Sequence, residues 1–320
     1  MFFGVYGACY TICFGVCVRS KSNAVLNMKK IIREVDKNRG IVQITVSDER
    51  WYLKPGKNAE TGIPEYTPVP SVTWIAGHWP KGVGFYKWLA DKGWDEAEAV
   101  KSAAGDKGSV VHLAIEMILN GEEFRVDTKV QDKSKSKEGE YEVRDLTYEE
   151  LLCVKSFMDW FNEVRPEILA TETTIFSDIH GYAGTVDFVC RIDGVPYVID
   201  FKTSKQVWKE HELQISAYRV ALENGENSLK DKEGKIIDIS GLKTAILQVG
   251  YERNKAGYKF TEIEDAFPMF QVAKQIWKSE IGDNHPGFTK RDFPLILANK
   301  KGVNELVAVS EVVKKTRKKK

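Results

Sequence analysis

Residues 181–205, GYAGTVDFVCRIDGVPYVIDFKTSK, constrain the fold more than any other part of this 320-residue chain. Two β-rich runs, residues 185–192 and 195–201, are separated only by Asp193-Gly194. Asp-Gly between alternating apolar runs is a strong signal for a β-hairpin with a type I′ turn, in which both central residues take positive φ. The sequence therefore predicts an antiparallel hairpin whose two-residue turn places Ile192 opposite Val195.

In that register, one face of the hairpin is almost wholly apolar and must be buried. It consists of Val186, Phe188, Cys190, Ile192, Val195, Tyr197, Ile199 and Phe201. The other face carries Asp187, Asp200 and Lys202, and the register places the two aspartates directly opposite each other. Like charges at paired positions destabilise a sheet, and a shared divalent cation would remove that cost. A solvated face on which lysine offsets two acids is the competing interpretation, and the opposition of the acids favours the metal site.

Polar pairs at helical spacing flank the hairpin on both sides. The pattern predicts helices over residues 108–120 and 207–223, and a strand over residues 169–177. His112 and Glu116 share one face of the first helix, as Gln214 and Tyr218 do in the second, because residues four apart are helical neighbours.

These motifs, taken in order, resemble a known family. Asp187 followed by Asp200-Phe201-Lys202 is similar to the core of the PD-(D/E)XK nucleases, and more narrowly to the RecB-type exonuclease branch with its phage and mitochondrial relatives. GSVVH at residues 108–112 and QISAY at residues 214–218 resemble that branch's GxxxH and QxxxY signatures. PSVT at residues 70–73 resembles a segment common in phage-type members. The eponymous Pro-Asp is replaced by Val186-Asp187, as in many relatives.

The resemblance implies a restriction-endonuclease-like α/β/α core, with a central sheet that is mixed because the hairpin is antiparallel. It implies metal-dependent phosphodiester hydrolysis by Asp187, Asp200 and Lys202. The implied ligands of Mg²⁺ or Mn²⁺ are His112, Asp187, Asp200 and the backbone carbonyl of Phe201. The implied substrate-binding residues are Gln214, Tyr218, Ser204 and Lys205. Glu172, on the strand before the hairpin, and Glu116 are further candidates near the metal.

Composition limits the cofactors and partners. The net charge is only +1, so a DNA-binding surface must be a local patch. The five cysteines form no disulfide framework, which suits a reducing cytoplasm, with the mitochondrion as the alternative. Cys153 and Cys190 cannot supply the four ligands of the iron–sulfur members, so we expect no cluster. The expected partners are single-stranded DNA or DNA ends, together with a single-strand-binding or recombination protein, and a membrane is not expected.

We expect four segments along the chain. Residues 1–27 form a non-core extension, for which a mis-called start upstream of Met28 and a weak membrane anchor over the uncharged residues 1–18 are the two interpretations. Residues 28–105 are an N-terminal elaboration with strands over 41–46 and 51–53, a loop over 54–70 and helices over 82–92 and 96–103. Residues 106–285 are the nuclease core, in which a further helix is expected over 262–278. Residues 286–320 end in a basic tail.

The predicted function is a metal-dependent DNA exonuclease acting in phage or genome replication, recombination or repair. A structure-selective or restriction-type endonuclease would use the same residues. A non-catalytic DNA-binding recombination module would be expected to lose an acid or Lys202, and this sequence keeps all of them. A membrane-tethered protein unrelated to nucleic acid would depend on residues 1–18 alone.

Overall fold

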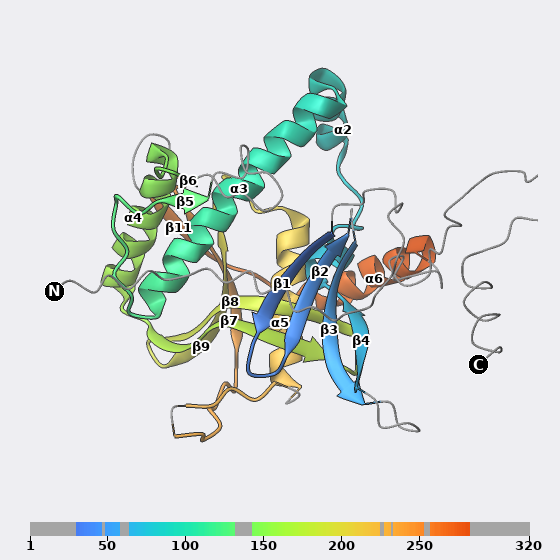
Figure 1. Ribbon diagram of the computed structural model, residues 1–320, viewed down its shortest axis with the longest axis vertical. Coiled ribbons are helices and arrows are strands. Elements are labelled where there is room, and N and C mark those ends of the chain that lie inside the picture. Colours follow the sequence, from blue (N-terminus) through green and yellow to red (C-terminus); the bar gives the residue numbers. More distant parts are fainter. Residues whose placement is uncertain are drawn as a thin grey trace, which may run out of the picture. The chain divides into compact units, whose positions relative to one another are not determined.

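A five-stranded mixed sheet lies at the centre of the computed structural model (Figure 1). Its strands, in the order β11-β10-β9-β8-β7, are β7 (Glu167–Ser177), β8 (Tyr182–Ile192), β9 (Val195–Lys202), β10 (Lys243–Val249) and β11 (Tyr258–Glu262). Strands β9 and β10 run parallel, while the other neighbours are antiparallel. The mixed sheet is therefore confirmed, but β11 was missed. The helix expected to begin at residue 262 begins instead at Phe267.

The β8–β9 hairpin has the predicted turn. Asp193 and Gly194 have φ values of 50° and 82°, and Ile192 pairs with Val195. The register continues unchanged to the pair Phe188–Ile199. The local Asp-Gly signal was therefore sufficient to fix the pairing over this part of the hairpin.

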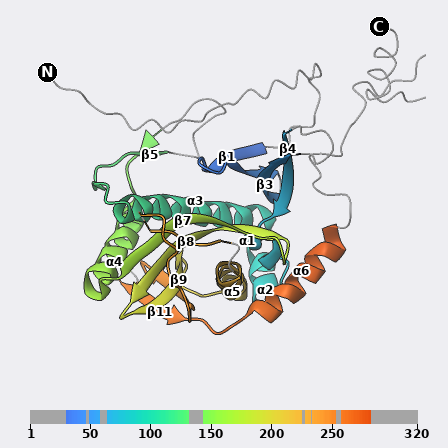
Figure 2. The same ribbon diagram turned by 90° about the horizontal axis from the view of Figure 1, so that it is seen from below.

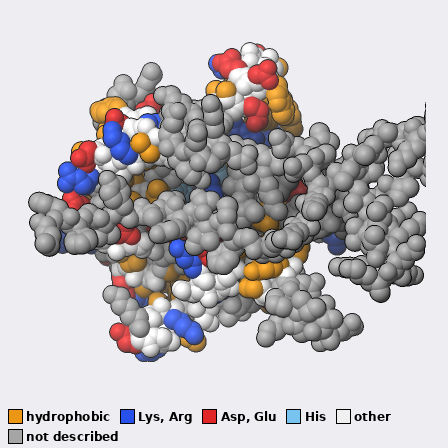
Figure 3. Space-filling view, viewed as in Figure 1, with side chains coloured by type: hydrophobic (Ala, Val, Ile, Leu, Met, Phe, Trp, Pro, Cys, Tyr) orange, Lys and Arg blue, Asp and Glu red, His pale blue; other side chains and the backbone are white. Residues whose placement is uncertain are grey.

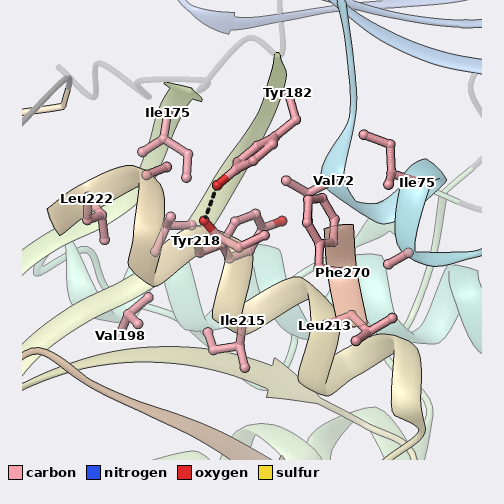
Figure 4. Close-up of a cluster of buried hydrophobic side chains, with 14 of the residues drawn as sticks. Val72, Ile75, Ile175, Tyr182, Val198, Leu213, Ile215, Tyr218, Leu222 and Phe270 are labelled. Carbon is pink, nitrogen blue, oxygen red and sulfur yellow. Dashed lines mark hydrogen bonds between the residues drawn. The ribbon is translucent and has the colours of Figure 1, made fainter. Parts of the chain in front are cut away.

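Helices cover both faces of the sheet (Figure 2). On one face, α3 (Trp94–Leu119) and α4 (Tyr148–Val164) pack over a cluster that includes Phe188, Ile199 and Phe201. On the other face, α1 (Val72–Ala76), α5 (Lys209–Glu223) and α6 (Phe267–Ile281) pack over a cluster that includes Val189 and Val198. Figure 4 shows part of this second cluster, where the Tyr182 hydroxyl donates to the carbonyl oxygen of Ala217 at 2.9 Å. The predicted α/β/α arrangement is confirmed.

The break predicted between two helices at residues 104–107 is wrong, because α3 is continuous from Trp94 to Leu119. Glycine in a helix costs about 1 kcal/mol relative to alanine, but extending an existing helix is cheaper than nucleating a second one. Gly105 and Gly108 are therefore tolerated, and the boundary expected between residues 105 and 106 falls inside α3.

Near α2 (Val83–Lys92) and the start of α3, exposed apolar side chains lie beside acidic ones (Figure 3).

The N-terminal elaboration contains a four-stranded antiparallel sheet. Its strands are β1 (Lys30–Asp36), β2 (Ile41–Val46), β3 (Glu49–Lys57) and β4 (Pro64–Pro70), paired in chain order. The predicted pairing of residues 41–46 with 51–53 is confirmed. The loop predicted over residues 54–70 is wrong at residues 54–57 and 64–70, which belong to β3 and β4, while residues 58–63 lie outside the described residues. Prolines 64, 68 and 70 are an even number of residues apart, so their missing N–H groups all lie on one side of the edge strand, where no partner needs them.

The structure describes residues 30–281 except 47–48, 58–63, 132–142, 225–226, 232 and 253–256. The described residues belong to one compact unit. The short strands β5 (Val130–Gln131) and β6 (Val143–Arg144) pair within it. The predictions for residues 1–27 and 286–320 lie outside the described residues. None of the described helices is both long enough and apolar enough to cross a membrane.

Candidate active site

The β8–β9 ladder ends at Phe188–Ile199, just before the two aspartates. The predicted pair Asp187–Asp200 does not form. Instead, Asp187 Oδ2 accepts a hydrogen bond from the Phe201 backbone N–H at 2.9 Å. A side chain thus satisfies a backbone donor that the end of the ladder leaves unpaired. The alternation of faces also shifts here. The sequence predicts that Val186 shares a face with Phe188, and this is wrong, because Val186 packs with Val189 on the α5 side of the sheet.

His112, Glu172 and Asp187 bring ligand atoms within 4.8 Å of one another. They come from α3, β7 and β8, which are separate in sequence. His112 Nδ1 lies 3.5 Å from Asp187 Oδ1, and His112 Nε2 lies 3.0 Å from the carbonyl oxygen of Phe201. Three predicted ligand groups therefore converge: the imidazole of His112, the carboxylate of Asp187 and the carbonyl of Phe201. Glu172 joins them.

Asp200 lies outside that group of three and has partners of its own. Its Oδ1 accepts a hydrogen bond from Gln214 Nε2 at 2.9 Å, and Gln214 Nε2 also donates to the Tyr218 hydroxyl at 3.0 Å. Its Oδ2 forms an ion pair with Lys202 Nζ at 2.5 Å, and this buried atom has no other polar partner among the described residues. An under-satisfied buried carboxylate oxygen beside an imidazole and two further carboxylates is a donor set that fits a divalent cation.

Glu172 has a strained backbone conformation, with a φ of 41° in the middle of β7. Positive φ is uncommon outside glycine and persists where the surrounding structure enforces it, often at functional sites. Its neighbours Thr171 and Thr173 pair with Phe188 and Val186, so Glu172 lies across from Asp187. The strain accompanies the placement of a third carboxylate beside Asp187.

The electrostatics show the cost of assembling these acids without a cation. Burial and then the charge of Asp187 raise the pKa of Glu172 to about 8. Burial also raises the pKa of Asp200 to about 6 against the opposing charge of Lys202, with Asp187 adding to the rise. Burial alone would lower the pKa of His112, but the adjacent Asp187 outweighs it and raises that pKa to about 9. A bound cation would offset this repulsion.

The raised pKa of Glu172 predicts how the metal-free protein responds to pH. The folded state holds this proton more tightly than the unfolded chain, whose value is near 4.5. The Glu172 contribution to the free energy of unfolding therefore falls as pH rises from about 4.5 to about 8. Because glutamine does not titrate, Glu172→Gln should lose about 1–3 kcal/mol less stability than the wild type over this pH range. Urea unfolding in EDTA at pH 5 and pH 8.5 measures it, with exposed Glu98→Gln on α3 as the control. Equal pH slopes in the wild type and Glu172→Gln would contradict the prediction.

Gly184 allows Tyr218 to pack against β8. A Cβ at this position would lie 2.4 Å from Tyr218 Cε1, a distance at which the ring must move. We expect Gly184→Ala to cost about 1–3 kcal/mol of stability by overpacking. Because Tyr218 is hydrogen-bonded to Gln214, and Gln214 to Asp200, a displaced Tyr218 ring should disturb Asp200 and lower cleavage as well. Gly84→Ala is the matched control, since a Cβ there meets no heavy atom of the described residues within 4 Å. Unchanged melting temperature and cleavage in Gly184→Ala would show that the ring adapts freely.

The remaining predicted residues lie around this centre. Gln214 and Tyr218 are both buried rather than on an open surface, and Gln214 Nε2 donates to both Asp200 Oδ1 and the Tyr218 hydroxyl. Ser204 donates from Oγ to the carbonyl oxygen of Gln206, and Lys205 is exposed. Glu116 is outside the group of three, although its charge contributes to the raised pKa of Glu172.

Gln248 was missed by sequence reasoning. It pairs with Lys202 across the parallel β9–β10 ladder, and its Nε2 donates to the carbonyl oxygen of Ser204 at 2.8 Å. It thereby holds the loop that follows β9. No motif marks Gln248, because its role depends on a strand pairing that the sequence pattern does not reveal.

Comparison with protein-family models agrees with this geometry, although comparison with individual curated proteins finds no match. A family model described as the PD-(D/E)XK nuclease superfamily matches residues 85–291, which is more than half of the chain and includes every residue of the site described above. Strands β1–β4 and helix α1 lie before the matched segment. With the mixed sheet, the converging acids and this match, the chain belongs to the PD-(D/E)XK nuclease superfamily.

Proposed function

We propose that the chain is a metal-dependent deoxyribonuclease of the RecB-type branch that acts as an exonuclease on single-stranded DNA or DNA ends. Membership of the superfamily implies a nuclease, and such nucleases typically use divalent metal ions. The observation that carries the proposal is the convergence of His112, Glu172 and Asp187 next to the Asp200–Lys202 ion pair. The GxxxH and QxxxY signatures support the RecB-type branch and, through it, the exonuclease activity and a role in phage or genome replication, recombination or repair.

In this proposal, His112, Asp187, Asp200 and the carbonyl of Phe201 hold Mg²⁺ or Mn²⁺, with Glu172 as a further ligand. The bound ion would polarise the scissile phosphate and lower the pKa of a water molecule. A site that combines imidazole with carboxylates suits Mn²⁺ as well as Mg²⁺. The ligands come from separate elements of a packed core, so their positions are fixed before the ion binds.

Lys202 and Gln214 both contact Asp200 but have different roles. The Lys202 ammonium lies 2.5 Å from Asp200 Oδ2 and places a positive charge where negative charge develops on the phosphate. Gln214, bonded to Tyr218, orients the Asp200 carboxylate from the side of α5. Because Gln214 and Tyr218 are buried, we assign them a positioning role, and we assign contact with the substrate to the exposed Lys205 and the adjacent Ser204.

The test is cleavage by the purified full-length chain. Substrates are end-labelled linear single-stranded DNA, linear duplex DNA, circular single-stranded DNA and linear RNA, each with Mg²⁺, with Mn²⁺ or with EDTA. We expect mononucleotides or short products from linear DNA with either metal, no cleavage in EDTA and none of the circle. Cleavage of the circle would show an endonuclease, and no cleavage of any substrate with either metal would refute the proposed function.

A further inference from the structure

A row of paired residues leads from the catalytic lysine across the sheet. Lys202 on β9 pairs with Gln248 on β10, and Gln248 pairs with Lys259 on β11. Neighbouring strands are about 4.8 Å apart, so the backbone of Lys259 lies about 10 Å from that of Lys202. A group bound near Lys259 would therefore be close to a phosphate held at Lys202.

A cavity of about 410 Å³ lies along this row. The residues that line it include Lys205, Trp208, Glu212, Gln248, Lys259 and Thr261. Lys205 and Trp208 come from the segment between β9 and α5, and Lys259 and Thr261 come from β11. The cavity therefore lies between the segment that follows the catalytic strand and the edge of the central sheet.

The cavity carries a net positive charge. Lys205 and Lys259 are exposed, and no described carboxylate forms an ion pair with either. The acid that lines the cavity, Glu212, is paired with Lys209 at 2.6 Å. Lys205 and Lys259 are thus available to an anion, and the charge of Glu212 is neutralised.

Trp208 supplies an aromatic surface at the same place. Its side chain is 50% exposed, although tryptophan normally packs in a core or an interface. Its backbone N–H contacts His211 Nδ1 at 3.3 Å, which holds the residue at the start of α5. On the opposite wall, Thr261 Oγ1 is buried and has no hydrogen-bond partner among the described residues. An exposed aromatic ring beside two exposed ammonium groups that form no ion pair with a described carboxylate is an arrangement that binds a nucleotide.

We propose that this cavity binds one nucleotide of a single-stranded nucleic acid. Its base stacks on Trp208, and the phosphates on either side of it lie at Lys205 and Lys259. The proposal rests on the proposed function, because it places that nucleotide next to the one cleaved beside Lys202. A paired base inside a duplex has both faces covered, so this subsite selects single strands. It accepts any base, since stacking uses the π-face that all bases share.

The test measures binding separately from cleavage. All variants carry Asp187→Asn, and binding of a fluorescein-labelled twelve-residue oligothymidylate is followed by fluorescence anisotropy in EDTA. We expect Trp208→Ala to weaken binding roughly tenfold and Trp208→Phe to restore most of it, because stacking on one aromatic ring is lost and regained. Trp94→Ala is the matched control, since Trp94 is 67% exposed at the start of α3 and does not line the cavity. It should bind like the parent.

Two further measurements separate stacking from charge. Lys259→Ala should reduce the slope of log affinity against log salt concentration by about 0.7, the value for one phosphate contact on a single strand. An oligonucleotide of abasic residues should bind the parent and Trp208→Ala equally, because it offers no base to stack. Both results together would support a nucleotide subsite rather than a general basic patch.

The proposal is overturned if Trp208→Ala binds oligothymidylate as tightly as the parent, or if Trp94→Ala loses as much affinity. These outcomes are distinct from failure of the proposed function. A wild type that cleaves DNA while Trp208→Ala binds normally would remove the subsite and keep the nuclease. A wild type that cleaves nothing while binding depends on Trp208 would keep the subsite and remove the nuclease.

Discussion

The Asp187→Asn variant is expected to lose cleavage by at least about 10³-fold while keeping its fold, because it removes a charged ligand oxygen from the centre of the site. Asparagine can still accept the Phe201 N–H through its amide oxygen, so the bond that ends the β8–β9 ladder is preserved. What it cannot supply is the negative charge that faces His112 and Glu172. The loss should therefore affect metal binding and chemistry rather than folding.

Thermal melting with and without metal tests this separation. A ligand at a hundredfold excess over its Kd stabilises the folded state by about 2.7 kcal/mol, so the wild type should melt several degrees higher in Mn²⁺ or Mg²⁺. Asp187→Asn should show little of that increase. Asp159→Asn, an exposed acid on α4, is the control and should keep both the increase and the activity. Cleavage within tenfold of the wild type, or a full metal-induced increase in Asp187→Asn, would place the metal elsewhere.

The Lys202→Met variant is expected to lose cleavage by about 10²–10³-fold, since it removes the charge next to the reacting phosphate. It should also destabilise the metal-free protein by about 3–5 kcal/mol, because Asp200 is 1% exposed and its buried carboxylate would lose the positive charge of the Lys202 ammonium. Unlike Asp187→Asn, it should retain the metal-induced increase in melting temperature, because lysine is not a ligand and a bound cation partly replaces it.

A double variant separates the two effects of Lys202. Asp200→Asn combined with Lys202→Met removes both buried charges, so it should recover most of the lost stability and remain inactive. Lys155→Met, which breaks the exposed pair with Asp159, should change stability by less than about 1 kcal/mol. If Lys202→Met cleaves normally, Lys202 has only a structural role. If the double variant is as unstable as Lys202→Met, the ion pair is not what stabilises this end of β9.

Several features of the protein could be derived from local sequence because local chemistry determines them. The Asp193-Gly194 turn needs two positive φ values and so fixes the first pairs of the hairpin. Thr147 and Glu150 form a capping box that starts α4, as their spacing predicts. The motif residues His112, Asp187, Asp200 and Lys202 were found by spacing and resemblance, and the structure brings them to one end of the hairpin.

The tertiary structure decided what depends on contacts distant in sequence. The ladder stops before Asp187 and Asp200, where the Phe201 N–H donates to the Asp187 side chain instead of to a backbone carbonyl of β8. No pattern of alternating residues predicts that a side chain replaces a backbone acceptor. Glu172 reaches the site only through a strained residue in β7. The helix α3 remains continuous through two glycines because an extended helix needs no new nucleus.

The same distinction applies to the cavity next to Lys202. The sequence shows Trp208 six residues after Lys202 but does not show that Lys259 belongs to the same row. That row exists because β10 pairs parallel to β9 and antiparallel to β11, and parallel pairing requires a crossover through α5 rather than a turn that can be read locally. The sequence by itself therefore determined the hairpin, its turn and the residue types of the candidate site. Only the packing of distant strands and helices decided which side chains meet, because burial and long-range pairing are properties of the whole fold.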